Sequence, residues 1–398
     1  MTRAVVVIDG EHYASVVRDA IAELPYDVVG AWLAGGMEKL RGGEEYGVPL
    51  LTELDDGFAL AEVVVDLSDE PVLGPRDRFR LASRALAAGL RYEGADFRFE
   101  PLQYASFPLP SLAVIGTGKR VGKTAVTGHV ARLLARERDV VVVAMGRGGP
   151  AQPVIAEAAP TLGMLLELSR SGEHAASDYL ETAALTGVVT IGCRRAGGGL
   201  AGAVTMSNVL QGAALAAERE PDVVVFDGSG AAIPPIDVDA RILVSGADQD
   251  PTAYLNAYRV FVSDLVVLIG DVDAGRVRAL KDVPVIRADL RLRPVAPLAG
   301  RRVAVFTTGP APTDHLDGEV VSVSRNLADR ARLRADLART DAEVFVVEIK
   351  AAAIDVVAEL ASERGVEVVF AENEVVPLPG EPDLDDAILQ LVPTGART

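Results

Sequence analysis

The chain has 398 residues, of which 49% are hydrophobic and 24% charged, so two or three globular domains are expected. Its formal net charge of −18 argues against nucleic acid or an anionic membrane as the main partner, because both require a broad basic surface. A single cysteine, Cys193, excludes an intramolecular disulfide, and we find neither a signal-peptide pattern nor a long apolar run. We therefore expect a cytoplasmic protein, and a homodimer as the commonest kind of assembly.

Residues 1–108 are expected to form a Rossmann-like α/β domain, because apolar β-branched runs alternate with helical patterns. The predicted elements are strands at 4–8, 28–33 and 63–67 and helices at 13–24 and 76–90. Such alternation is typical of a parallel sheet, in which ligands bind beyond the carboxyl ends of the strands. Asp9 and His12 follow the first strand at that edge, so they are candidate substrate-binding residues, with a structural cap as the alternative.

Residues 109–299 form a second predicted unit, which begins near the prolines at 108 and 110 because proline ends regular elements. Its predicted strands lie at 112–115, 140–144, 188–191, 223–226, 242–244 and 266–269, with helices between most of them. The first strand leads into a glycine-rich stretch, and a helical pattern over 125–136 follows. This is the most informative part of the chain.

The stretch 116–124 reads Gly-Thr-Gly-Lys-Arg-Val-Gly-Lys-Thr and has the strand–loop–helix context of a phosphate-binding loop. Glycines let backbone N–H groups converge on one anion, and the positive end of the following helix adds to the attraction. In such a loop Lys123 neutralises the β- and γ-phosphates of ATP, and the Thr124 hydroxyl binds Mg²⁺. The predicted nucleotide-binding residues are Gly116, Thr117, Gly118, Lys119, Arg120, Val121, Gly122, Lys123 and Thr124.

The loop departs from the strict Gly-x4-Gly-Lys-Thr pattern, because Thr117 stands where glycine is expected and Gly116 lies one step earlier. Its spacing resembles the loop of dethiobiotin synthetases, which belong to the same P-loop class as the MinD-like ATPases. Lys119 lies one position from the signature lysine of MinD-type loops, and we include it with Lys123 among the catalytic candidates. The chain has no Asn-Lys-x-Asp guanine signature, which favours ATP over GTP.

Two further catalytic candidates follow strands of the same unit. Asp227 ends the apolar run 223–226, where P-loop enzymes place an acid near the metal, so Asp227 and Thr124 are the predicted metal ligands. A turn or cap residue is the alternative for Asp227. Arg147 lies in Gly-Arg-Gly-Gly-Pro at 146–150, where we expect it beside the transferring phosphoryl group. An arginine on a flexible surface turn is the alternative there.

Paired arginines follow the third predicted strand of this unit. Arg194 and Arg195 precede the glycine run 197–199, and guanidinium forks beside exposed backbone N–H groups make an anion site. Together with Arg147, they supply more positive charge than ATP alone requires. The sequence therefore indicates a polyanionic acceptor substrate bound by these three arginines. Cys193 has no evident base partner, and we expect a buried thiol.

Residues 300–398 follow a proline-containing linker at 294–300 and predict a third α/β unit. The predicted elements are strands at 302–306, 320–323, 344–349 and 367–370 and helices at 327–338 and 351–363. The tail after Pro377 has little core-forming pattern apart from 384–391. The expected fold class is α/β, with a central P-loop NTPase domain and a mostly parallel sheet, flanked by N-terminal and C-terminal α/β units.

Five segments, in order, resemble the cyclic 2,3-diphosphoglycerate synthetase family, best known from hyperthermophilic methanogens. They are Val-Ile-Asp-Gly-Glu-His-Tyr at 7–13, the glycine-rich loop at 116–125, Gly-Arg-Gly-Gly-Pro at 146–150, Gly-Cys-Arg-Arg-Ala-Gly-Gly-Gly at 192–199 and Asp-Gly-Ser-Gly-Ala-Ala-Ile-Pro-Pro at 227–235. Weaker resemblance lies at 348–351 and 373–378 in the third unit.

The resemblance implies an enzyme that converts 2,3-bisphosphoglycerate and ATP into the cyclic phosphoanhydride, ADP and phosphate, with ATP and Mg²⁺ at the site. Two alternatives remain open. One is another dethiobiotin-synthetase-like ligase or kinase with a carboxylate substrate, although the arginines favour a phosphorylated one. The other is a MinD-like ATPase switch, which would require an aligned signature lysine and an amphipathic partner or membrane helix.

Overall fold

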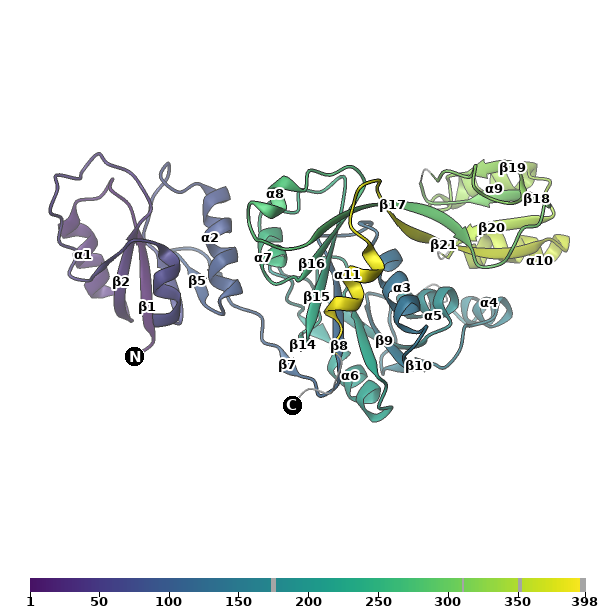
Figure 1. Cartoon of the computed structure of the whole chain (residues 1–398), viewed down its shortest axis with the longest axis horizontal. Coiled ribbons are helices and arrows are strands. Elements are labelled where there is room, and N and C mark those ends of the chain that lie inside the picture. The colour runs from purple at the N-terminus through teal and green to yellow at the C-terminus, as the bar shows by residue number, and fades with distance from the viewer. Residues whose placement is uncertain (173–176, 310, 350–352, 394–398) are drawn as a thin grey trace.

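The structure of the chain is a computed structural model, and it describes residues 1–172, 177–309, 311–349 and 353–393 (Figure 1). Three α/β units follow one another along its longest axis, with the N-terminal unit at one end and the C-terminal unit at the other. The predicted α/β class with mostly parallel sheets is confirmed.

The N-terminal unit is a mostly parallel sheet covered on both faces, in which only the edge strand β6 is antiparallel to its neighbour. Its strands are β1 (Arg3–Ile8), β2 (Asp27–Leu33), β3 (Leu50–Leu51), β4 (Val63–Asp66), β5 (Arg91–Glu93) and β6 (Arg98–Phe99). Its helices are α1 (Ala14–Glu23), the 3-10 helix η1 (Leu54–Leu60) and α2 (Pro75–Ala87). Val5 and Val7 of β1 pack into one apolar cluster and Val6 and Ile8 into another, which explains the continuous apolar run. The strands lie in the order β3-β2-β1-β4-β5-β6, so the chain adds strands on one side of β1 and then, from β4 onward, on the other side. The point between β1 and β4 is the topological switch point of the sheet.

The central unit follows a short linker strand, β7 (Ala105–Ser106), which pairs with β14 (Ile236–Asp237). Its other strands are β8 (Ser111–Gly116), β9 (Val140–Gly146), β10 (Val154–Ala156), β11 (Val189–Ala196), β12 (Met206–Ser207), β13 (Val223–Asp227), β15 (Ala240–Gly246), β16 (Leu265–Ile269) and β17 (Val285–Pro294). Its helices are α3 (Lys123–Leu134), α4 (Leu162–Arg170), α5 (Asp178–Thr186), α6 (Val209–Glu218), α7 (Asn256–Phe261) and α8 (Gly275–Arg278).

The C-terminal unit has a smaller parallel sheet with helices packed on it. Its strands are β18 (Arg302–Phe306), β19 (Glu319–Ser324), β20 (Val344–Glu348) and β21 (Glu367–Pro377). Its helices are α9 (Arg330–Arg339), the π-helix η2 (Ala353–Ala358), α10 (Glu359–Arg364) and α11 (Leu384–Leu391). The helix predicted at 351–363 corresponds to η2 and α10, and its first two residues, 351 and 352, lie outside the described residues.

The central and C-terminal units share one sheet. In the described part of the chain it has 13 strands, in the order β10-β11-β9-β13-β8-β15-β16-β17-β21-β20-β18-β19, with β12 beside β11. The long antiparallel pair β17 and β21 bridges the two units (Figure 1). After β21 the chain returns to the central unit, where Leu384 and Ile388 of α11 are buried in the same apolar cluster as Val126 and Val130 of α3. This return explains why 384–391 carries apolar residues in an otherwise polar tail.

One strand is longer than the sequence indicates. The prediction ended the third strand of the central unit at residue 191, whereas β11 continues to Ala196. The extension is held because Arg194 pairs in register with Gly146 of β9, and Arg195 pairs with Ser207 of β12. Arg194 and Arg195 therefore lie within the strand rather than in the loop after it.

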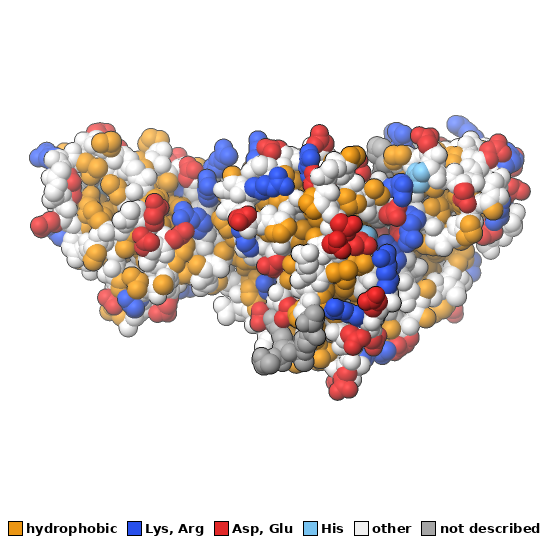
Figure 2. Space-filling model, in the orientation of Figure 1, with side chains coloured by type: hydrophobic (Ala, Val, Ile, Leu, Met, Phe, Trp, Pro, Cys, Tyr) orange, Lys and Arg blue, Asp and Glu red, His pale blue; other side chains and the backbone are white. Residues whose placement is uncertain are grey.

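Acidic and basic side chains are interspersed over the face shown in Figure 2, and its described part shows no single broad basic expanse. This distribution agrees with the net charge of −18. Within the described ranges, the helices are all too short or too polar to traverse a lipid bilayer.

Candidate active site

The glycine-rich loop occupies the centre of the shared sheet. Strand β8 lies between β13 and β15, and the loop leads from its carboxyl end into α3. Gly122 has φ +88°, which favours glycine, and it begins α3 so that Lys123 and Thr124 form the first turn. The loop rests on β15, because Thr117 N–H donates to Val244 O at 3.1 Å. Lys119 and Arg120 are exposed at the loop's outer edge.

Lys123 is folded back onto Asp227 in this structure. Its Nζ forms an ion pair with Asp227 Oδ1, and Thr127 Oγ1 donates to the same oxygen at 2.6 Å. Asp227 is 1% exposed, so burial raises the pKa of its carboxyl, while Lys123 and Thr127 act in the opposite direction. The end of β13 thus holds the acid against the first turns of α3.

Arg147 and Arg195 meet at one tight turn beside the loop. This turn, residues 229–232, is closed by backbone hydrogen bonds between Ser229 and Ala232 of 3.2 and 3.0 Å. Arg195 Nη2 donates to Ser229 O at 2.7 Å, and Arg147 lies so close that a Cβ on Gly230 would come within 2.5 Å of its Nη2. Burial and the charge of Arg147 both lower the pKa of Arg195.

The 229–232 turn also touches the phosphate-binding loop. A Cβ on Gly116 would lie 2.9 Å from Gly230 O, so the two backbones are in contact. Gly230 itself has φ +59°, a backbone conformation that residues other than glycine rarely adopt. The structure therefore brings Lys123, Asp227, Arg147 and Arg195 around neighbouring loops at one edge of the sheet.

Successive side chains of a strand point to opposite faces, so Arg194 lies on the face of β11 opposite to Arg195. Arg194 shares its face with Gly192, which packs against Tyr179 of α5, whereas Arg195 shares its face with Cys193, which packs against Gly212 of α6. Arg194 is half-buried, and its backbone N–H donates to Asn208 Oδ1 at 2.7 Å. Cys193 is a buried free thiol, and burial raises its pKa to about 12.

Asp9 and His12 lie in the N-terminal unit, just after β1, at the topological switch point between β1 and β4. Asp9 is fully buried; its Oδ1 accepts from Glu11 N–H at 2.9 Å and pairs with His12 Nδ1 at 2.8 Å, and its Oδ2 accepts from Asp69 N–H at 2.7 Å. Burial raises the pKa of Asp9, but these hydrogen bonds outweigh it and hold the pKa below its usual value. The residues form a local cluster on a different unit from Lys123.

Sequence reasoning missed two polar residues at the phosphate-binding edge. The Gln249 amide, beyond β15, packs directly against Gly118 of the loop. Asp178 begins α5 and lies near Gly146, where its carboxylate contributes to raising the pKa of Asp227 and opposes the lowering at Arg195. Gln249 follows a predicted strand at the ligand-binding edge, which was a usable signal. Asp178 follows no strand, and its place depends on how α5 packs.

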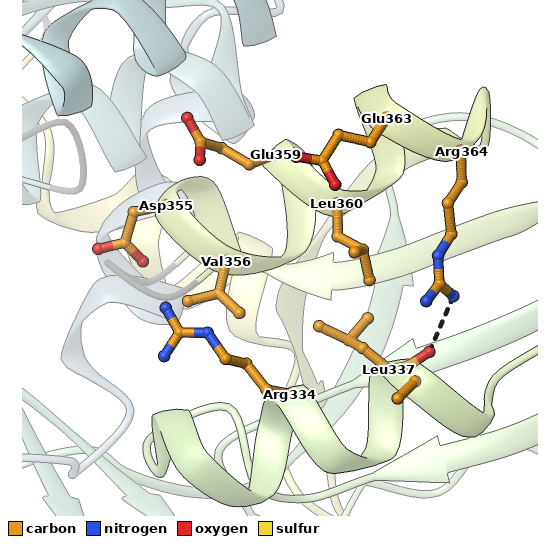
Figure 3. A pocket seen from close by; sticks show the side chains of 9 residues that line it. Arg334, Leu337, Asp355, Val356, Glu359, Leu360, Glu363 and Arg364 are labelled. Carbon is orange, nitrogen blue, oxygen red and sulfur yellow. Dashed lines mark hydrogen bonds between the residues drawn. The ribbon is translucent and has the colours of Figure 1, made fainter.

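A hollow of about 300 Å³ lies in the C-terminal unit, between α9 and the η2–α10 segment (Figure 3). Leu337 and Leu360 face each other across it, while Arg334 and Asp355 lie toward one side. Arg364 Nη1 donates to Leu337 O at 3.0 Å and closes its opposite side. The predicted site residues do not line this hollow, so it is separate from the phosphate-binding edge.

Comparisons with known proteins agree over the whole chain. Family models described as cyclic 2,3-diphosphoglycerate synthetase match as an N-terminal domain at residues 3–100, a P-loop domain at 111–282 and a C-terminal domain at 294–374. A protein of Rubrobacter xylanophilus named cyclic 2,3-diphosphoglycerate synthetase is 47% identical over 99% of this chain and 98% of its own length. One of the same name from Thermococcus kodakarensis is 40% identical over 97% and 98%.

Among solved structures, LpxK from Aquifex aeolicus in complex with ATP aligns over 73% of this chain and 90% of that chain, at 15% identity and a TM-score of 0.44. The P-loop domain match supports ATP binding by the central unit. All three family models and the near full-length relatives point to one enzyme family. The chain belongs to the cyclic 2,3-diphosphoglycerate synthetase family.

Proposed function

We propose that this enzyme uses ATP to close 2,3-bisphosphoglycerate into its cyclic phosphoanhydride, with release of ADP and phosphate. The names of the relatives support the reaction. The structural observation that carries it is the meeting of Arg147 and Arg195 at the 229–232 turn, against the phosphate-binding loop. A second anion site next to the ATP phosphates is what an acceptor with two phosphates requires.

The loop residues 116–124 are proposed to bind the ATP phosphates, with Lys123 and Arg147 as the charged groups nearest to transfer. For this, Lys123 has to leave Asp227 and turn to the nucleotide. Mg²⁺ fits the donors that would remain, because the Thr124 hydroxyl and the Asp227 carboxylate are oxygen ligands and phosphates supply others. Bound there, Mg²⁺ would neutralise charge on the phosphates.

The reaction has two phosphoryl-transfer steps. In the first, an oxygen of one substrate phosphate attacks the γ-phosphorus of ATP, the bond to the β-phosphate oxygen breaks, and ADP leaves. The first step leaves a pyrophosphoryl group on the substrate. In the second, an oxygen of the neighbouring substrate phosphate attacks the substrate-bound phosphorus of that group, the bond to the phosphate that came from ATP breaks, and inorganic phosphate leaves as the ring closes. Lys123, Arg147 and Arg195 align and neutralise the reacting anions throughout, which is the main catalytic need in such transfers.

The need for fixed positive charge can be estimated. Two unit charges about 4 Å apart repel by roughly 4 kcal/mol at an effective dielectric of about 20, and phosphate dianions repel more. Arg195 is held by Ser229 O and by Gly197 O at 2.6 Å, so its guanidinium is already oriented before substrate binds. A preoriented guanidinium offsets the repulsion without reorganisation. Arg194 is proposed to bind substrate from the α5 side, and Asp9 and His12 from the N-terminal unit.

The arginines can be tested by steady-state ADP release with 2,3-bisphosphoglycerate as acceptor. Arg195→Ala should lower kcat/KM for the acceptor by about tenfold or more, with the KM for ATP little changed, and Arg195→Lys should restore only part because the fork is lost. Arg219→Ala, which removes a surface ion pair with Glu157, is the matched control and should behave as wild type. Wild-type kcat/KM in an Arg147→Ala, Arg195→Ala double variant would place the acceptor elsewhere.

A panel of acceptors separates this reaction from that of another ligase. Phosphorylated three-carbon acids should support ADP release, whereas carboxylic acids without phosphate should not. We also propose a cytoplasmic homodimer, since closed dimers are the commonest assemblies. Light scattering of the purified protein measures its mass in solution and tests the dimer.

A further inference from the structure

Arg259 of α7 is a buried charge that the proposed chemistry leaves unexplained. Its side chain is 1% exposed. In the described part of the chain, its hydrogen-bond acceptors are three backbone carbonyls and one amide oxygen, and no carboxylate is among them. A buried guanidinium without a counter-ion is costly, because desolvation is offset only by neutral acceptors. The positions of its hydrogen-bond acceptors therefore indicate which part of the structure Arg259 stabilises.

The carbonyls that Arg259 binds belong mainly to loops at the phosphate-binding edge. Nε and Nη2 both donate to Ala231 O, at 3.0 and 2.5 Å. Nη1 donates to Leu200 O at 3.1 Å and to Leu255 O, one turn back, at 3.0 Å. Ala231 lies in the 229–232 turn after β13, and Leu200 directly follows the glycine run 197–199 in the loop between β11 and β12. The Arg259 side chain thus connects the loop after β11 with the turn after β13, two strands that are separated in the sheet only by β9.

Three arginines contact three successive residues of the 229–232 turn. Arg195 donates to Ser229 O, Arg147 lies against Gly230, and Arg259 donates to Ala231 O. Arg147 is exposed and Arg195 is half-buried, whereas Arg259 is in the interior. Two like-charged guanidinium groups therefore lie close together at a turn that also accepts two hydrogen bonds from the buried Arg259.

We propose that Arg259 is a positioning residue of the acceptor site, which holds the 229–232 turn and the 197–200 loop in the arrangement that Arg147 and Arg195 require. This inference rests on the proposed function. Arg259 makes no described hydrogen bond to the phosphate-binding loop, which meets the turn through Gly230, whereas the turn accepts directly from Arg195. Loss of Arg259 should therefore affect the acceptor more than ATP. Burial lowers its pKa to about 10, so the group keeps its charge at neutral pH and adds to the positive potential beneath the turn.

Helix α7 also packs against α2 of the N-terminal unit. The ring of Phe79 on α2 meets Tyr254, just before α7, edge-on with centroids 5.6 Å apart. Arg259 therefore lies on the same short helix that joins the N-terminal unit to the central unit. A variant that only loosened this packing would change stability without changing acceptor binding selectively.

Lys281 provides a matched control on the same part of the fold. It is a partly buried cation whose Nζ donates to the carbonyls of Phe261, at 2.9 Å, and Ser263, at the far end of α7. Burial lowers its pKa, as at Arg259. Its acceptors do not include the 229–232 turn or the 197–200 loop, so Lys281→Met removes a comparable anchor of α7 without touching the acceptor site.

The test compares Arg259→Met, Arg259→Lys and Lys281→Met in the full-length enzyme. The measurements are thermal denaturation, ATP affinity by calorimetry, and acceptor KM and kcat with 2,3-bisphosphoglycerate. Arg259→Met should lose about tenfold or more in kcat/KM for the acceptor, with ATP affinity within about twofold of wild type. Arg259→Lys should restore part of the loss, since it keeps the charge but not the fork. Lys281→Met should lower the melting temperature and leave acceptor kcat/KM unchanged.

Three outcomes would overturn the inference: a folded Arg259→Met with wild-type acceptor kcat/KM, full restoration by lysine, or an equal acceptor defect in Lys281→Met. Failure of both Arg259 variants to fold would also overturn it, because Arg259 would then be a general core residue. If the wild-type enzyme neither binds nor converts 2,3-bisphosphoglycerate, the proposed function fails instead. The wild-type measurement therefore distinguishes the two failures.

Discussion

At the scale of single residues, the ion pair between Lys123 and Asp227 is the central feature of the candidate site. Both side chains are nearly buried, and the ion pair joins the start of α3 to the end of β13. Under the proposed function, nucleotide phosphates would compete with Asp227 for Lys123, so binding of ATP would exchange one partner of the lysine for another. The carboxylate released in that exchange would then be available to a metal ion bound with ATP.

Replacing Asp227 with Asn should therefore affect turnover much more than nucleotide affinity. Asparagine keeps the shape but supplies no charge, so we expect kcat at limiting Mg²⁺ to fall on the order of 10²-fold, with the Kd for ATP changed only a few-fold. Titration of Mg²⁺ at saturating ATP measures the effect. Asp178→Asn is the comparison, because Asp178 is the nearby acid at the start of α5. Unchanged turnover in Asp227→Asn, with a loss in Asp178→Asn, would assign the role to Asp178.

Residues in continuous motifs could be predicted from the sequence, and residues brought in by packing could not. Lys123 and Thr124 are specified locally, because the glycines, the preceding strand and the following helix are all adjacent in the chain. Gln249 contacts Gly118 only because β15 lies next to β8. Arg259 lies between Tyr258 and Val260, and a charge within that apolar stretch was the only sign of its burial.

At the scale of elements, α3 is held at both ends. Its first turn carries the loop residues, and its last turns are fixed to the C-terminal segment. Arg132 of α3 pairs with Glu372 of β21, which also pairs with Arg293 of β17. His129 of α3 contacts Asp385 of α11 at 2.7 Å. The strand predicted at 367–370 was correct in type, whereas 384–391 was singled out only for its apolar pattern and forms α11. The return of both segments to α3 depends on long-range pairing.

The Arg132–Glu372–Arg293 network should contribute measurably to stability. Glu372 is 5% exposed, so Glu372→Gln leaves two guanidinium groups without their shared counter-ion. Because both arginines are partly exposed, we expect a loss of about 2 kcal/mol, below the range for a fully buried pair, and a melting temperature lower on the order of 5 °C. Calorimetry of Glu374→Gln is the control, since Glu374 on the same strand forms an exposed pair with Arg291. Equal effects of the two substitutions would contradict a special role for the network.

At the scale of the whole molecule, the central unit carries the phosphate-binding loop, and the other two units contact it from either end. We propose domains at 1–108, 109–299 and 300–398, with the last segment of the third packed on the second. The N-terminal unit contacts the centre through α2 and α7, and the C-terminal unit through β17, β21 and an apolar cluster that joins Leu165 and Leu180 to Ile349 and Ile354. The three units were visible in the sequence as alternating patterns. Their common sheet was not, because strand adjacency between units has no local signal.

The most direct test of the account is ³¹P NMR of the purified enzyme with ATP, Mg²⁺ and 2,3-bisphosphoglycerate, beside the Lys123→Ala variant. The account predicts that the two phosphomonoester signals are replaced by those of a cyclic phosphoanhydride, with ADP and phosphate formed in equal amounts. Lys123→Ala should slow this conversion on the order of 10³-fold, because the charge on the transferring phosphates is no longer neutralised. ATP hydrolysis without a cyclic product, or near wild-type conversion by Lys123→Ala, would contradict the account.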